Sequence, residues 1–126
     1  MKTSELTGAA LDWAVARCEK LDAYTDIAGD GWGVFVDYSD DYCLVQYQPS
    51  KHWGWAGPII EREKIDLNWD VTLSHRVDGL WFASASGGDD DMTASTPLVA
   101  AMRAYVASKF GDEIDVPKEL IDEETN

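Results

Sequence analysis

Apolar residues recur at helical spacing near both ends of the chain. The first pattern begins after Thr7, which is a suitable N-cap, and predicts a helix that ends near Asp22. The second pattern begins at Thr96 and Pro97, a cap and first-turn pair, and ends before Gly111. The expected buried positions are Leu11, Ala14, Val15, Cys18 and Leu21 in the first helix and Leu98, Met102, Tyr105, Val106 and Phe110 in the second.

Between these helices the apolar residues follow the spacing of strands. Residues 33–38 and 42–48 are rich in β-branched and aromatic residues, and Ser39–Asp41 suits a tight turn between them. Apolar residues then alternate with polar ones from Ile65 to Leu73, which predicts a strand with Trp69 on its buried face. Asp78-Gly79 is a hairpin signal, and residues 80–85 form the expected return strand.

The order of these elements predicts the α+β class. We expect a single domain over residues 1–126, with a mainly antiparallel four-stranded sheet packed against the N-terminal and C-terminal helices. Pro49 to Gly57 is irregular, and a short helical turn is expected from Pro58 to Glu63. Residues 112–126 carry seven acids and one lysine, which predicts an acidic tail that packs in part through Ile114, Val116 and Leu120.

The charge balance excludes several classes of partner. The chain of 126 residues has 10 basic and 24 acidic side chains, a net charge of −14. Such a chain is not expected to bind nucleic acid directly or to adhere to an anionic membrane. It has no apolar run of transmembrane length and no signal-peptide pattern, so we expect a cytoplasmic protein. In that compartment Cys18 and Cys43 should be free thiols.

Three stretches of the chain carry a resemblance to a known family. They are residues 6–16 (LTGAALDWAVA), residues 47–53 with 57–63 (YQPSKHW and GPIIERE), and residues 96–113 (TPLVAAMRAYVASKFGDE). In these stretches the chain resembles the NinX-like proteins of tailed phages and prophages. The family's usual Gly-Gly-Pro stands here as Ala56-Gly57-Pro58. The resemblance implies a phage or prophage origin and expression in the bacterial cytoplasm, and it implies no reaction.

The motifs that usually carry catalysis or metal binding are missing from the sequence. His52 and His75 have no partner at zinc-ligand spacing, and no nucleophile elbow or phosphate loop occurs. Four residues match a calcium-loop template incompletely and are interpreted as loop carboxylates: Asp26, Asp30, Gly31 and Asp37. Glu61 and Glu63 would share a face if extended, but the interleaved basic residues are also typical of a solvated turn. We therefore expect no enzyme activity, cofactor or metal.

The tryptophans provide the most informative candidate site. Trp53 and Trp55 lie in the irregular segment beside Lys51 and His52, where exposed aromatic residues serve recognition or fold back as a lid on a small core. Residues 51–76 have four basic and four acidic residues and are neutral, so an anion would meet the least repulsion there. The candidate binding residues are Lys51, His52, Trp53, Trp55, Arg62 and Arg76.

These observations favour a non-enzymatic phage accessory protein that binds a host or phage protein. Its acidic surface would steer it toward basic partners. A first alternative is a binder of a small anionic, nucleotide-like ligand, and a second is a mimic of nucleic-acid charge through Asp22–Asp41 and the tail. An unrecognised hydrolase is the alternative with the least support.

Overall fold

The computed structural model describes residues 1–29, 31–37, 44–70, 80–85 and 91–121. The elements in chain order are η1 (Thr3–Glu5), α1 (Gly8–Cys18), β1 (Ala23–Ala28), β2 (Gly31–Asp37), β3 (Leu44–Gln46), α2 (Trp53–Glu63), β4 (Asp66–Asp70), β5 (Leu80–Ser84), β6 (Met92–Ala94), α3 (Pro97–Phe110) and η2 (Lys118–Leu120). The α+β class is confirmed.

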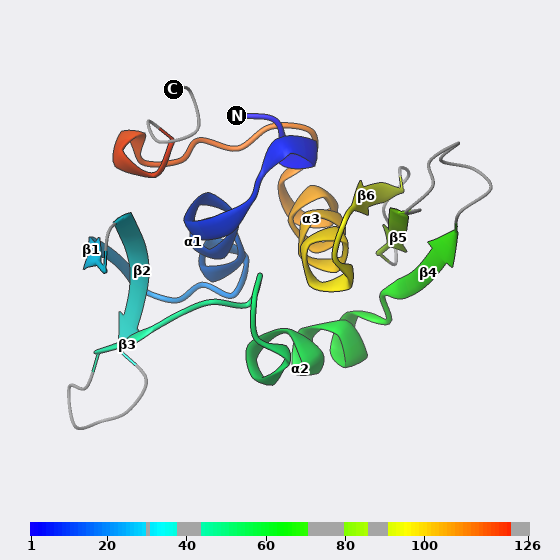
Figure 1. The fold of residues 1–126 in the computed structure, drawn as a ribbon, viewed down its shortest axis with the longest axis horizontal. Coiled ribbons are helices and arrows are strands. Elements are labelled where there is room, and N and C mark those ends of the chain that lie inside the picture. The colour runs from blue at the N-terminus through cyan, green and yellow to red at the C-terminus, as the bar shows by residue number, and fades with distance from the viewer. Residues whose placement is uncertain (30, 38–43, 71–79, 86–90, 122–126) are drawn as a thin grey trace.

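The strands form two sheets, so the prediction of one four-stranded sheet is wrong. Each sheet has three antiparallel strands, in the orders β1-β2-β3 and β4-β5-β6. Helices α1 and α3 lie between the two sheets, and α2 runs below them (Figure 1). The strands before and after α2 are thereby kept apart, because each sheet covers a different helix.

Two strands that the sequence pattern did not predict complete these sheets. Strand β1 pairs with β2 from Ala23↔Val36 to Ala28↔Gly31, and β6 pairs with β5 from Trp81↔Ala94 to Ala83↔Met92. Half of β1 is exposed, and β6 has only three residues. Neither strand therefore shows the run of alternating apolar residues by which the others could be found.

Helix α1 begins where expected and ends one turn early. Thr7 has an extended backbone at the N-cap, although its side chain makes no capping hydrogen bond. The helix ends at Cys18, and Lys20 adopts a left-handed conformation with φ of 60°. Leu21 consequently lies outside the helix and is exposed, which corrects its assignment to the buried face.

Helix α3 is buried over much of its length. Thr96 Oγ1 accepts a hydrogen bond from the Val99 N–H at 3.3 Å, and Gly111 ends the helix with φ of 82°, as the sequence predicted. Its buried residues surround most of its circumference: Leu98, Ala100, Ala101, Met102, Ala104, Tyr105 and Val106. Phe110 is 41% exposed, so its assignment to the buried face is wrong.

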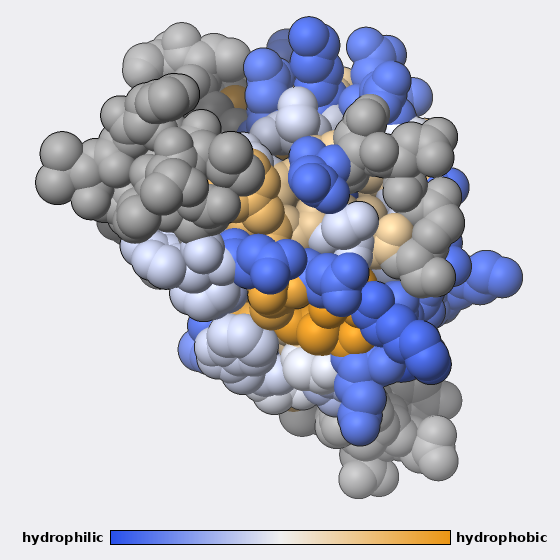
Figure 2. Space-filling model, turned by 90° about the vertical axis from the view of Figure 1, so that its right-hand side faces the viewer, coloured by the Kyte–Doolittle hydropathy of each residue, from blue (hydrophilic) through white to orange (hydrophobic). Residues whose placement is uncertain are grey.

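The second sheet also departs from the expected burial. Trp69 lies opposite Trp81, with ring centroids 5.4 Å apart, yet half of Trp69 remains exposed. The prediction that Trp69 belongs to the core is therefore wrong. Figure 2 views this side of the molecule and shows apolar surface confined between hydrophilic residues. Val71, Leu73 and the Asp78-Gly79 turn lie outside the described residues, as does the Ser39–Asp41 turn.

The two ends of the chain pair with each other. The Met1 amino group donates to the Ile114 carbonyl, and the Ile114 N–H donates to the Met1 carbonyl, both at 3.0 Å. Ile114 and Leu120 are buried, and Val116 packs against the core. The segment after α3 thus contacts the core through these three residues in the part of it that the structure describes.

Leu98 is buried in α3 and Phe110 is exposed, so a charged substitution should lower the unfolding free energy far more at Leu98 than at Phe110. Leu98→Asp places a charge at a buried site and should cost about 4 kcal/mol or more of unfolding free energy, enough to unfold the chain. Tyr105→Asp should have the same effect. Phe110→Asp is the matched control and should cost under about 1 kcal/mol, because that side chain already meets water. Chemical denaturation measures both, and equal losses would contradict the packing described.

Candidate functional site

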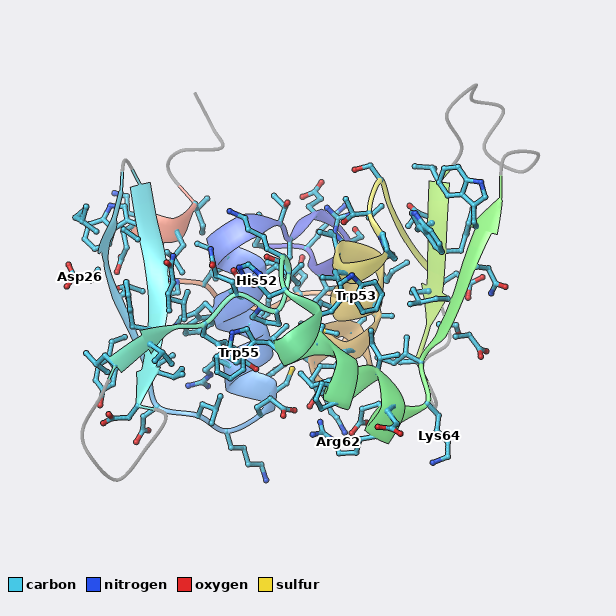
Figure 3. The ribbon with its side chains drawn as sticks, turned by 60° about the horizontal axis from the view of Figure 1, so that its bottom comes forward. Asp26, His52, Trp53, Trp55, Arg62 and Lys64 are labelled. Atoms are coloured by element: carbon cyan, nitrogen blue, oxygen red, sulfur yellow. The ribbon has the colours of Figure 1, made fainter. Side chains whose placement is uncertain are left out.

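The expected site residues lie along α2 and not in an irregular loop. Lys51 precedes the helix, His52 is its N-cap, Trp53 and Trp55 lie in its first turn, and Arg62 lies in its last (Figure 3). Arg76 lies outside the described residues. The prediction that the helical turn starts at Pro58 is therefore corrected to a start at residue 53.

The sequence pattern does not predict this helix, because Gly54, Gly57 and Pro58 are all unfavourable in the interior of a helix. Pro58 has no N–H to donate to the Gly54 carbonyl. Both residues are exposed, so water can hydrate that carbonyl. The helix is also held at its start, where the N–H groups of Lys51 and His52 donate to the Gln48 carbonyl at 3.0 Å.

The two tryptophans of α2 have different surroundings. Trp53 is 53% exposed. Trp55 is half-buried and meets the ring of Tyr47 edge-on, with centroids 5.0 Å apart and an interplanar angle of 66°. Positions two apart on a helix point in different directions, and Figure 3 shows the two indoles on different sides of α2. Trp55 is thus a packing residue, and Trp53 is the surface residue.

The cationic residues of the candidate site are also divided. Lys51 and His52 are exposed, and His52 Nε2 lies 3.2 Å from Gln48 Oε1. Arg62 instead forms a two-pronged pair with Glu19, at 3.1 Å from Nη1 to Oε1 and 2.6 Å from Nη2 to Oε2. The structure therefore brings Lys51, His52 and Trp53 together and places Arg62 at the other end of α2.

Arg62 belongs to a cluster that joins the ends of α1, α2 and α3. Its Nη2 donates to Tyr105 Oη at 3.1 Å, and Tyr105 donates in turn to Glu19. Its Nε donates to Glu63 at 2.8 Å, and Glu63 also lies 3.6 Å from Lys109. The hydrogen bond from Arg62 lowers the pKa of the Glu63 carboxyl, and those to Glu19 and Glu63 raise the pKa of Arg62. This cluster holds α2 in place and leaves Arg62 poorly suited to bind a ligand.

The carboxylate patterns noted in the sequence do not form chemical sites among the described residues. Glu61 and Glu63 lie two positions apart on α2, so they do not share an extended face. Asp26 and Asp37 lie in the paired strands β1 and β2 and not in one calcium loop, while Asp30 lies outside the description. Within the described ranges, no three His, Cys, Asp or Glu side chains could together hold a metal ion.

Sequence reasoning missed Asp12, the one acidic side chain that is buried in the described part of the chain. It lies in α1, is 3% exposed, and accepts a hydrogen bond from the Ser50 N–H at 2.8 Å. Burial raises the pKa of Asp12 from 3.8 to about 7, against the opposing influence of the Ser50 N–H and the Lys51 charge. The alanines at positions 9, 10, 14 and 16 were the available signal, because small residues around α1 allow close packing on several sides.

Both cysteines are expected to be free thiols, and the structure describes one of them, Cys18. Cys18 is a free cysteine, and burial raises the pKa of its thiol to about 12. A thiol with so high a pKa stays protonated near neutral pH and is a poor nucleophile. Cys43 and His75 lie outside the described residues.

Comparison with models of known protein families shows to which family the chain belongs. The model of the family described as "Bacteriophage P22, NinX" matches residues 2–109. The chain belongs to this NinX family. No curated protein matches it. Family membership makes the chain a phage protein and assigns it no reaction or partner. None of the helices in the described ranges has the length and apolarity to cross a bilayer.

The buried carboxyl predicts how the stability of this NinX-family protein varies with pH. Because the pKa of Asp12 is higher in the folded chain than in the unfolded chain, its contribution to the unfolding free energy falls as pH rises from about 4 to about 7. At about 1.4 kcal/mol for each pKa unit, the fall is at most about 4 kcal/mol. The difference in unfolding free energy between the wild type and Asp12→Asn isolates it, because the other titrating groups cancel. A difference that stays constant from pH 4 to 8 would contradict the burial.

Proposed function

We propose that this NinX-family protein is a non-enzymatic accessory protein that binds a basic protein of the phage or its host, with Trp53 as the central contact. The observation that carries the proposal is the exposure of the Trp53 indole on the first turn of a helix. Half-exposed tryptophans on rigid elements are favoured anchors of protein interfaces, since they bury a large apolar area with little loss of conformational freedom.

Charge supports the choice of partner. The neutral segment 51–76 allows Trp53 to be covered without a large local repulsion, while the net charge of −14 acts over the molecule as a whole. A field of that sign accelerates the approach of a basic protein and slows that of an acidic one. The association rate should therefore fall as salt is added.

The absence of enzyme activity is part of the proposal. The two glutamates at the C-terminal ends of α1 and α2 are engaged in ion pairs, since Glu19 and Glu63 are both paired with Arg62. The protonated Cys18 thiol is unsuited to nucleophilic attack. These contacts support binding over catalysis.

The mimicry of nucleic acid remains the competing proposal for a basic partner. Asp22, Asp26 and Asp37 are exposed near or within the β1–β2 hairpin, on a different part of the chain from Trp53. If these acids made the interface, removal of Trp53 would leave binding intact. The two proposals can therefore be separated by substitution.

Trp53→Ala should abolish capture of the partner from infected or lysogenic cells while lowering the unfolding free energy by under about 1 kcal/mol, because the side chain is half in water. Trp55→Ala should cost about 1–3 kcal/mol through loss of its packing on Tyr47. Quantitative mass spectrometry of the captured proteins and chemical denaturation measure the two effects.

Trp69→Ala is the matched control, since it removes an equally exposed indole from another element and should retain the partner. The double variant Asp26→Asn with Asp37→Asn tests mimicry. Loss of the partner in this variant, together with its retention by Trp53→Ala, would overturn the proposal in favour of mimicry.

A further inference from the structure

A cleft of about 670 Å³ opens beside α1, and Trp53 takes no part in its wall. It lies between the first half of α1, the facing ends of β1 and β2 at Ala28 and Gly31, and the segment that leaves β3. Asp12, Trp32, Gln46, Gln48 and Lys51 supply its chemically distinctive side chains. A cleft of this size falls within the range of small-molecule sites in proteins.

Two buried polar groups, the Asp12 carboxyl and the Ser50 hydroxyl, lie at or next to the cleft. Asp12 is 3% exposed and accepts a hydrogen bond from the Ser50 N–H at 2.8 Å. Ser50 Oγ is buried and makes no hydrogen bond within the described ranges. Because buried polar atoms in proteins are nearly always hydrogen-bonded, such a pair is typical of a place that receives donors from a ligand.

The other side chains that line the cleft limit the chemical class of ligand that it could bind. Trp32 presents an indole that is 37% exposed, against which a flat ring can stack. The amide of Gln46 can both donate to and accept from the edge of a heterocycle, whereas the Gln48 side-chain carbonyl oxygen lies 3.2 Å from His52 Nε2. Lys51 adds a positive charge close enough to Asp12 to oppose the rise in its pKa. The cleft thus combines a stacking surface, a buried acceptor and a cation.

These features exclude simpler ligands. An apolar molecule would cover Asp12 without giving its carboxyl a hydrogen-bond donor. A free cation would be repelled by the Lys51 ammonium group. A small anion alone would be repelled by the Asp12 carboxylate. A ligand that carries amino groups on a flat ring at one end and an anionic group at the other satisfies all three side chains.

We propose that this cleft binds a nucleoside monophosphate, with the base stacked on Trp32, its amino group donating to Asp12, and the phosphate at Lys51. The near-neutral pKa of Asp12 adds a second option, because the carboxyl can also donate to a ring nitrogen when it is protonated. The proposed site is independent of the protein-binding surface at Trp53, so either can fail without the other.

Isothermal titration of the full chain with AMP, GMP, CMP and UMP tests the site, with adenosine, guanosine and ribose 5-phosphate as partial probes. We expect one saturable site per chain, tighter binding of a base with an exocyclic amino group than of UMP, and weaker binding of ribose 5-phosphate. Asp12→Ala and Trp32→Ala should each weaken binding about tenfold or more. Lys51→Ala should weaken binding of the nucleotide but not binding of its nucleoside.

Lys64→Ala and Trp53→Ala are the matched controls and should bind as the wild type does, because neither residue lines the cleft. Circular dichroism establishes that each variant is folded, and Asp12→Asn, which preserves the shape of the side chain, replaces Asp12→Ala if the latter does not fold. Absence of saturable binding by every nucleotide at millimolar concentration would overturn the proposal. So would equal affinity for ribose 5-phosphate, or equal losses in the control variants.

Discussion

Burial of α3 between α1 and the β4–β6 sheet is the constraint on which the rest of this structure depends. A helix that is apolar around most of its circumference needs cover on several sides, and one sheet cannot supply it. The second sheet therefore packs on one side of α3 and α1 on another, while the first sheet covers α1 (Figure 1). Arg103 extends this arrangement, since its Nε donates to the Leu6 carbonyl and its Nη1 to the Thr93 carbonyl, both at 2.7 Å.

This arrangement also determines which side chains are available for function. The Glu19–Arg62–Tyr105 cluster fixes the C-terminal end of α2 against α1 and α3, which leaves the Trp53 end facing solvent. On α1, Asp12 is buried beside Ser50 and lines a cleft. The helices thus position two separate features, the exposed Trp53 at the start of α2 and the cleft beside α1.

Local signals in the sequence predicted the elements that carry clear caps and periodicity. Thr96, Pro97 and Gly111 define α3 because each acts locally, Thr96 through its capping side chain and the other two through their backbone conformation. Strand β1 and helix α2 escaped prediction for the opposite reason: β1 exists through its pairing with β2, and α2 persists despite Gly54 and Pro58 because its ends are held. Burial of individual residues was harder still, since the exposure of Trp69 and the burial of Asp12 depend on what packs against β4 and α1.

The candidate site was predictable to the extent that it is local. Trp53, His52 and Lys51 adjoin in sequence and remain together on the surface, whereas the role of Arg62 depends on Glu19, which is 43 positions away in the chain. The pairing of Asp12 with Ser50 spans 38 positions and has no local signature. Long-range contacts of this kind are set by the packing of α1 and α3 and cannot be read from spacing.

The most direct measurement of the central claim is hydrogen–deuterium exchange of the protein alone and in complex with its captured partner. If Trp53 is the central contact, the amides at the start of α2, residues 53–56, should exchange more slowly in the complex, while those of the β1–β2 hairpin should keep their rates. Protection confined to the hairpin, with the start of α2 unchanged, would contradict the account.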